Sequence, residues 1–181
     1  MNTHRSRTKI PEKRNPPTHI AIAVNQVWTW DITWLNASIK GQYYKLYLIV
    51  DMFSRFIVGY EVWETEKNDN PYSESLFKTM KYRPKYPFKG FGSLEEARKW
   101  VQKFVKWYNY SHLHSGINFL TPYQRHYGLD KEIIKKRQET YEKARAKNPE
   151  RWSKSIRDWS LPEYVSLNPI KEEELKKYVN E

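Results

Sequence analysis

Residues 27–35 read Val-Trp-Thr-Trp-Asp-Ile-Thr-Trp-Leu and alternate in character from one residue to the next. Even-numbered positions from 28 to 34 are apolar, whereas Thr29, Asp31 and Thr33 are polar. A period of two predicts a β-strand with two unlike faces. The strand therefore places one carboxylate, that of Asp31, near its middle and on the less apolar face.

Two further strands follow after short connections. Residues 43–51 carry apolar side chains at even positions from 44 to 50, and residues 56–63 form a third apolar run. The connections at 36–42 and 52–55 are short enough to join antiparallel neighbours. The sequence predicts a three-stranded antiparallel meander over residues 27–63.

Helical signals replace the strand pattern after residue 69. Asn70 is a suitable N-cap and Pro71 suits the first helical position, while Ser93 and Glu96 form a capping-box pattern. The sequence predicts helices over 70–82, 94–110 and 131–147, with a further helix start at 121–124. The third of these helices is highly charged, so we expect it to be exposed.

Composition excludes several classes of protein. The chain has 181 residues, a net charge of +11, 8 Trp, 14 Tyr and no Cys. A membrane span needs roughly 20 apolar residues in a row, and no such run occurs. The absence of Cys excludes disulfides and thiolate metal sites. The N-terminus lacks the apolar stretch of a signal peptide, which fits a cytoplasmic location.

Charge is distributed unevenly along the chain. The strand region, 21–66, has three Lys/Arg against five Asp/Glu, whereas 67–128 has eleven against four. An acid-leaning segment beside a basic one is typical of a metal site next to a phosphate-binding surface. The best phosphate-binding residues are Lys78, Lys81, Arg83, Lys85 and Lys89. The alternative for this cluster is an ordinary solvated basic face.

Asp31 and Glu74 are the candidate catalytic and metal-binding acids. Phosphoryl transfer on DNA commonly uses two divalent metals that are held by several carboxylates. Asp31 lies in a strand, and Glu74 lies in the first turns of a predicted helix, on one face with Lys78 and Lys81. The ordinary alternatives are a polar-face Asp and an exposed Glu–Lys helix pair.

Several motifs, in the same order along the chain, resemble the retroviral-type integrase core of insertion-sequence transposases of the IS3 group. The first pair is Gln26-Val27-Trp28-Thr29-Trp30-Asp31-Ile32-Thr33 and Tyr47-Leu48-Ile49-Val50-Asp51-Met52-Phe53-Ser54-Arg55. Asp69-Asn70-Pro71-Tyr72-Ser73-Glu74-Ser75 resembles the start of that family's third-acid helix. Tyr108-Asn109, His112, His114 and Thr121-Pro122 resemble its C-terminal signature. The likeness covers most of residues 1 to about 165.

The resemblance implies an RNase H-like α/β fold and a Mg²⁺- or Mn²⁺-dependent transposase with an Asp-Asp-Glu set. Asp31 matches the first acid and Glu74 the third. A segment like His-Ser-Asp-Asn-Gly, which carries the second acid on a fourth strand, has no counterpart in this chain. The usual N-terminal helix-turn-helix region is also missing. We therefore expect an internally deleted, N-terminally truncated core that lacks the family's activity.

Other acids and histidines offer weak substitutes. Asp51 ends the second strand and Asp69 stands beside a helix start, so a structural role is expected for both. His112 and His114 form a His-x-His pair without a nearby acid, which favours loop packing or phosphate contact over metal binding.

Three functions stay open: an inactive transposase remnant, a compact metal-dependent nuclease that uses a substitute acid, and a non-catalytic DNA- or transposase-binding regulator. The predicted domains are a basic arm at 1–24, a partial integrase core at 25–128 and a charged helical extension at 129–181. Expected partners are DNA, a second copy or a full-length transposase, at the bacterial nucleoid and not in a membrane. Without a fourth strand, residues 27–35 become a sheet edge, so association or aggregation is expected.

Overall fold

The computed structural model describes residues 19–64, 79–83, 86–153 and 155–168. Its centre is a three-stranded antiparallel sheet in the order β2-β3-β4, formed by Trp28–Asn36, Tyr43–Asp51 and Ile57–Trp63. The predicted meander is confirmed, with strand bounds that differ by at most one residue. The short predicted connections are also present, and Arg55 in the second of them has a left-handed backbone (φ 66°).

The less apolar face of β2 turns inward. Asp31 and Thr33 are each 6% exposed, whereas Trp28 and Trp30 on the opposite face are 56% and 43% exposed. Cross-strand partners share a face, and the partner of Asp31 on β3 is Leu48, which is buried. The apolar face of β3 therefore determines which side of β2 is covered.

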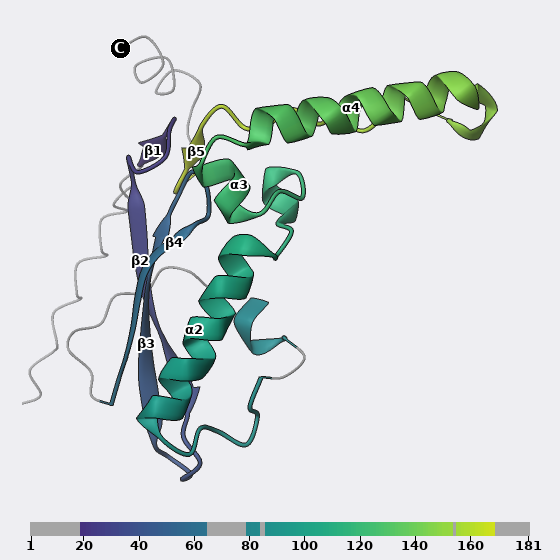
Figure 1. The fold of residues 1–181 in the computed structure, drawn as a ribbon. Coiled ribbons are helices and arrows are strands. Elements are labelled where there is room, and N and C mark those ends of the chain that lie inside the picture. Colours follow the sequence, from purple (N-terminus) through teal and green to yellow (C-terminus); the bar gives the residue numbers. More distant parts are fainter. Residues whose placement is uncertain (1–18, 65–78, 84–85, 154, 169–181) are drawn as a thin grey trace, which may run out of the picture.

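One amphipathic helix, α2 (Leu94–Tyr110), covers the inner face of the sheet (Figure 1). Its buried stripe includes Ala97, Val101, Phe104 and Tyr108. These side chains form one hydrophobic core with buried residues of all three strands, among them Leu35, Leu46, Leu48, Val50, Ile57 and Val62. The predicted helix over 94–110 is confirmed.

The N-terminal caps of the helices match the prediction except for one hydrogen bond at α2. The Ser93 hydroxyl accepts the Glu96 N–H at 3.1 Å, but the Glu96 carboxylate accepts the Gly92 N–H instead of the Ser93 N–H. Half of the predicted capping box is therefore present at α2. The short helix α3 (Pro122–His126) begins with a complete box between Thr121 and Gln124.

The last long helix, α4 (Asp130–Lys147), extends away from the sheet and α2 (Figure 1). Most of its residues are exposed, as its charge predicted. Two short 3₁₀ helices, η1 (Ser115–Ile117) and η2 (Pro149–Arg151), follow α2 and α4. Within the described residues, no helix is both long enough and apolar enough to cross a bilayer.

Two features were not predicted. The strands β1 (Ile20–Ala21) and β5 (Val165–Ser166) pair antiparallel as a separate sheet. The buried Trp159 packs its ring 5.2 Å from that of Tyr141 on α4. Two-residue strands leave no periodic signal. The helix predicted at 70–82 falls mainly outside the described residues, although residues 79–81 are helical.

Gly90 ties the segment before α2 to the end of β2. Gly90 has φ +88°, and a Cβ at this position would lie 2.2 Å from the Ala37 carbonyl oxygen. Phe91 N–H donates to the Asn36 carbonyl at 2.8 Å, and Ser38 N–H donates to the Phe91 carbonyl at 2.9 Å. The backbone of this segment therefore approaches the sheet too closely for any side chain at position 90.

We predict that Gly90→Ala lowers the free energy of unfolding more than Gly41→Ala, the matched control. Gly41 has φ +87° but open space around its missing Cβ, so its substitution should cost only the left-handed backbone strain, about 1–2 kcal/mol. Overlap at Gly90 should add roughly 1–3 kcal/mol. Urea denaturation of both variants measures the difference, and equal losses would contradict the tight docking.

Candidate functional site

Asp31 is the one predicted catalytic acid that the structure describes; Glu74 lies outside the described residues. The Asp31 carboxylate is largely buried on the inner face of β2 and accepts the N–H of Ile32 at 2.7 Å. Asp31, the predicted first acid, therefore faces the core from the sheet, and one of its oxygens accepts a backbone hydrogen bond.

The Ile32 N–H that Asp31 bonds faces the open side of β2. Met52 N–H donates to the Val27 carbonyl, which therefore faces β3, whereas the Asn36 carbonyl accepts from Phe91 on the other side. In an antiparallel strand, the backbone N–H and C=O groups of successive residues point to alternate sides. Ile32 is four residues before Asn36, so its N–H points away from β3, as the Asn36 carbonyl does. Within the described residues, no strand pairs with this side of β2.

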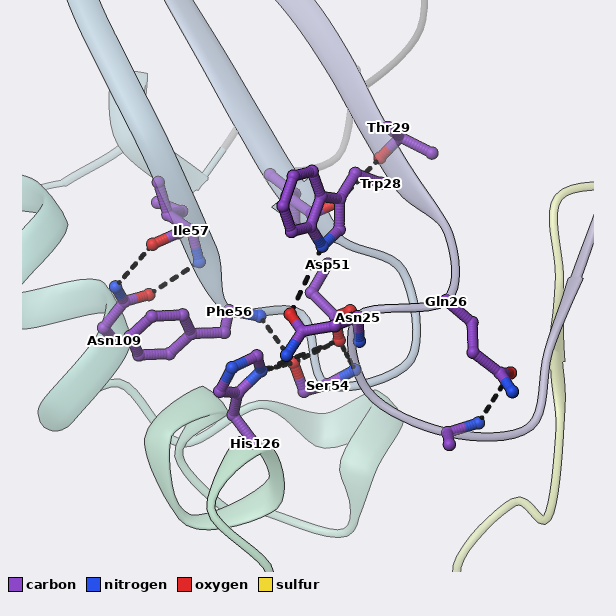
Figure 2. Close-up of polar contacts among 12 residues, drawn as sticks. Asn25, Gln26, Trp28, Thr29, Asp51, Ser54, Phe56, Ile57, Asn109 and His126 are labelled. Atoms are coloured by element: carbon purple, nitrogen blue, oxygen red, sulfur yellow. Dashed lines mark hydrogen bonds and ion pairs between the residues drawn. The ribbon is translucent and has the colours of Figure 1, made fainter.

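A buried polar junction joins the end of β3 to α2 and α3; we use this name for Asp51, Ser54, Asn109 and His126 (Figure 2). Asp51 and Ser54 have no exposed surface, and Asn109 is 3% exposed. Asp51 accepts three hydrogen bonds: from Asn25 N–H at 2.6 Å, Ser54 N–H at 2.8 Å and the Ser54 hydroxyl at 2.5 Å.

The hydrogen bonds of the junction show which partner the Ser54 hydroxyl donates to and which partners it accepts from. The single Ser54 hydroxyl proton is donated to Asp51 Oδ1. The hydroxyl oxygen must then accept from His126 Nδ1–H at 2.9 Å and from Phe56 N–H at 3.2 Å. Asp, Ser and His are therefore close together, but the arrangement is unlike a hydrolase triad, in which histidine takes the serine proton. It serves as a clamp between β3 and α3.

Asn109 of α2 completes the junction at the start of β4. Its side-chain oxygen accepts the Ile57 N–H at 2.9 Å, and its side-chain N–H donates to the Ile57 carbonyl at 3.0 Å. The carboxamide thus satisfies both backbone groups of an edge residue, as a neighbouring strand would. Sequence reasoning did not identify this role or that of His126, because the partners are 52 and 72 residues apart.

His112 and His114 pack against aromatic rings. The His112 ring lies 4.8 Å from the ring of Trp107, and the His114 ring meets Tyr108 edge-on at 6.3 Å. Burial, with smaller contributions from Arg55 and His112, lowers the pKa of His114 to about 4, so its imidazole is neutral at pH 7. This geometry fits the expected loop packing.

The predicted phosphate-binding cluster is described in part. Lys81 and Lys89 are exposed, and Lys78 and Lys85 lie outside the described residues. The Arg83 guanidinium lies 4.3 Å from the centre of the Trp107 ring, an arrangement that favours a cation–π interaction. Arg83 therefore packs against α2 in addition to contributing positive charge near Lys81.

Part of the chain matches a known family. Residues 65–122 match the family model described as "Integrase core domain". No curated protein and no solved structure matches the chain. The matched range includes the Glu74 segment, α2 and the start of α3, and it supports a retroviral-type integrase or transposase core with a function of that kind.

The integrase core family is generally metal-dependent, but the described residues do not fit a metal centre. Among them, no group of three or more His, Cys, Asp or Glu side chains could hold an ion. Asp31 bonds Ile32, and the suggested substitute Asp51 is enclosed by three donors. The other substitute, Asp69, lies outside the described residues.

We predict that Asp51→Ala destabilises the chain strongly, because it removes the acceptor of two buried Ser54 donors and of the part-buried Asn25 N–H. The free energy of unfolding should fall by about 3 kcal/mol or more, since each such group costs roughly 1–3 kcal/mol. Asp158→Ala is the matched control. Asp158 also accepts a backbone N–H, from Ser160 at 2.8 Å, but at an exposed site, so the change should stay within about 0.5 kcal/mol. Similar losses in both variants, measured by urea denaturation, would contradict the clamp.

Proposed function

We propose that the chain is a DNA-binding integrase core of an IS3-group transposase that has lost strand transfer. The observation that carries the proposal is the integrase-core match at 65–122, directly after a three-stranded meander whose first strand bears Asp31. In this proposal the fold is a partial RNase H-like core and the deletion removed the second catalytic acid. The protein then acts at nucleoid DNA in a bacterial cytoplasm.

The length of the chain between the two acids supports the loss of activity. Only ten residues, 64–73, separate the end of β4 from Glu74. A typical strand takes five or six residues and a typical helix eleven or twelve. There is no room for a further helix and a fourth strand that would present an acid beside Asp31. The open side of β2 agrees with such a deletion.

DNA is the proposed partner because of the basic region that follows the sheet. Lys78, Lys81, Arg83, Lys85 and Lys89 occur within twelve residues. Binding through phosphates weakens steeply with salt, because each neutralised phosphate releases counterions. Asp31 and Glu74 would be the remaining members of a Mg²⁺ or Mn²⁺ site, and no reaction step is assigned to them.

We predict salt-sensitive DNA binding without cleavage or joining. The purified chain, Asp31→Asn and Glu74→Gln would be incubated with element-end DNA and Mg²⁺ or Mn²⁺, and the products separated on denaturing gels. All three proteins should bind and none should cut. Cleavage by the wild-type chain that both variants lose would overturn the proposal and establish the compact nuclease. Failure to bind any DNA at low salt would contradict it as well.

A second candidate function is regulation by mixed assembly with full-length transposase. It is favoured by the outer face of the sheet, where Trp28, Trp30, Trp34 and Trp63 are each more than 40% exposed. A face of this kind beside an unpaired strand edge is an association surface. A chain that binds its relatives but lacks their chemistry would block them.

We predict that the chain self-associates and that Trp30→Lys weakens this association at least tenfold. A lysine in an edge strand opposes strand pairing. Trp63→Lys is the control, because Trp63 lies on the same face of the sheet but at its opposite edge, in β4, and so leaves the open edge of β2 unchanged. Sedimentation equilibrium of the three proteins measures the association. If the two variants weaken association equally, the contact involves the whole outer face of the sheet. A monomeric wild-type chain would show that this face does not mediate self-association.

A further inference from the structure

Two aromatic side chains project from the segment that precedes α2. Tyr82 is 83% exposed and Phe88 is 74% exposed, the highest values among the large hydrophobic side chains of the described residues. Single exposed aromatics are common on protein surfaces and need no explanation. These two differ because the backbone that carries them is held in place and because their neighbours are cationic.

Backbone hydrogen bonds hold the described residues on either side of 84–85. Arg83 N–H donates to the Met80 carbonyl, Tyr86 N–H to Arg83, and Gly90 N–H to Pro87. Met80 is fully buried in the core, so the first turn starts from a fixed point. Tyr82 is therefore presented from an ordered turn.

Aromatic packing anchors the other end. Tyr86 is 8% exposed, and its ring meets Phe91 and Trp100 edge-on at 6.3 and 5.4 Å. Gly90 lies directly against the Ala37 backbone. Phe88, whose ring is 5.4 Å from that of Tyr86, stands between these two anchors. A ring held in this way loses little conformational entropy when a second ring stacks on it.

The charge around these rings identifies the class of ligand. Residues 75–94 contain five Lys/Arg and no Asp or Glu. Lys81 precedes Tyr82 and Lys89 follows Phe88, and both lysines are exposed. Exposed aromatic rings that alternate with cations match the two needs of single-stranded nucleic acid, a stacking surface for bases and positive charge for phosphates.

We propose that Tyr82 and Phe88 stack on unpaired bases of single-stranded DNA while Lys81 and Lys89 contact its phosphates. The proposal rests on the DNA-binding function proposed above and adds the form of DNA that is bound. In duplex DNA the base faces are covered by their neighbours, so the two rings gain nothing there. Basic residues stand between the two rings in the sequence, which suits a polyanion better than an apolar protein surface.

The test compares a fluorescent 20-nucleotide strand with the same sequence as a duplex, using fluorescence anisotropy and the full chain. Tyr82→Ala and Phe88→Ala should each weaken single-strand binding by about 5- to 150-fold and duplex binding by less than twofold. Tyr82→Phe and Phe88→Tyr keep an aromatic ring and should stay within threefold of the wild-type affinity. Tyr127→Ala, at another exposed aromatic, is the control for loss of a ring elsewhere.

Salt titration distinguishes the proposed DNA binding through phosphates from the proposed stacking of Tyr82 and Phe88 on bases. Lys81→Gln and Lys89→Gln should each reduce the slope of log affinity against log salt by about one, for both forms of DNA, whereas the aromatic variants should leave it unchanged. Duplex binding with unaltered single-strand affinity in Tyr82→Ala and Phe88→Ala would overturn the stacking and keep the DNA-binding function. Equal losses on both forms would also overturn the stacking, and no binding to either form would overturn both proposals.

Discussion

The pairing of β2 with β3 determines most of what this chain presents to its surroundings. In an antiparallel pair, side chains opposite one another share a face. Because Leu46, Leu48 and Val50 belong to the core, their partners on β2 must face the core as well. Asp31 and Thr33 are therefore buried, and the tryptophans of β2 remain outside. One constraint thus places a carboxylate inside, an aromatic surface outside and an open strand edge beside both.

Local signals in the sequence were sufficient to predict the three strands of the central sheet and the positions of α2, α3 and α4. Alternation predicted three strands, and Ser93, Thr121 and Pro122 marked the helix starts that the structure contains. The inward face of β2 could not be read from its own alternation, because the more apolar side of this strand is the exposed one. The pairing of β1 with β5 joins segments far apart in the chain, and two residues carry no period.

The candidate site was predictable to a lesser extent. The resemblance identified Asp31, and the structure confirms its place in a central stretch of β2, while Glu74 is not described. The polar junction was missed because its order depends on tertiary contacts: the proton of Ser54, the amide of Asn109 and the ring of His126 meet only in the folded chain. Asp51 is an acid whose structural role could not be recognised from the sequence alone. It accepts two backbone N–H groups and the Ser54 hydroxyl within the fold, which gives it a structural role.

The outward extension of α4 has a consequence for how this molecule moves in water. Its 18 residues span about 27 Å at 1.5 Å per residue, and the helix points away from the body formed by the sheet and α2 (Figure 1). A lever of that length raises the frictional drag well above that of a sphere of equal mass. The monomer should therefore elute early from a sizing column, and its tumbling should be anisotropic. An elution volume alone would overstate the number of copies in an assembly.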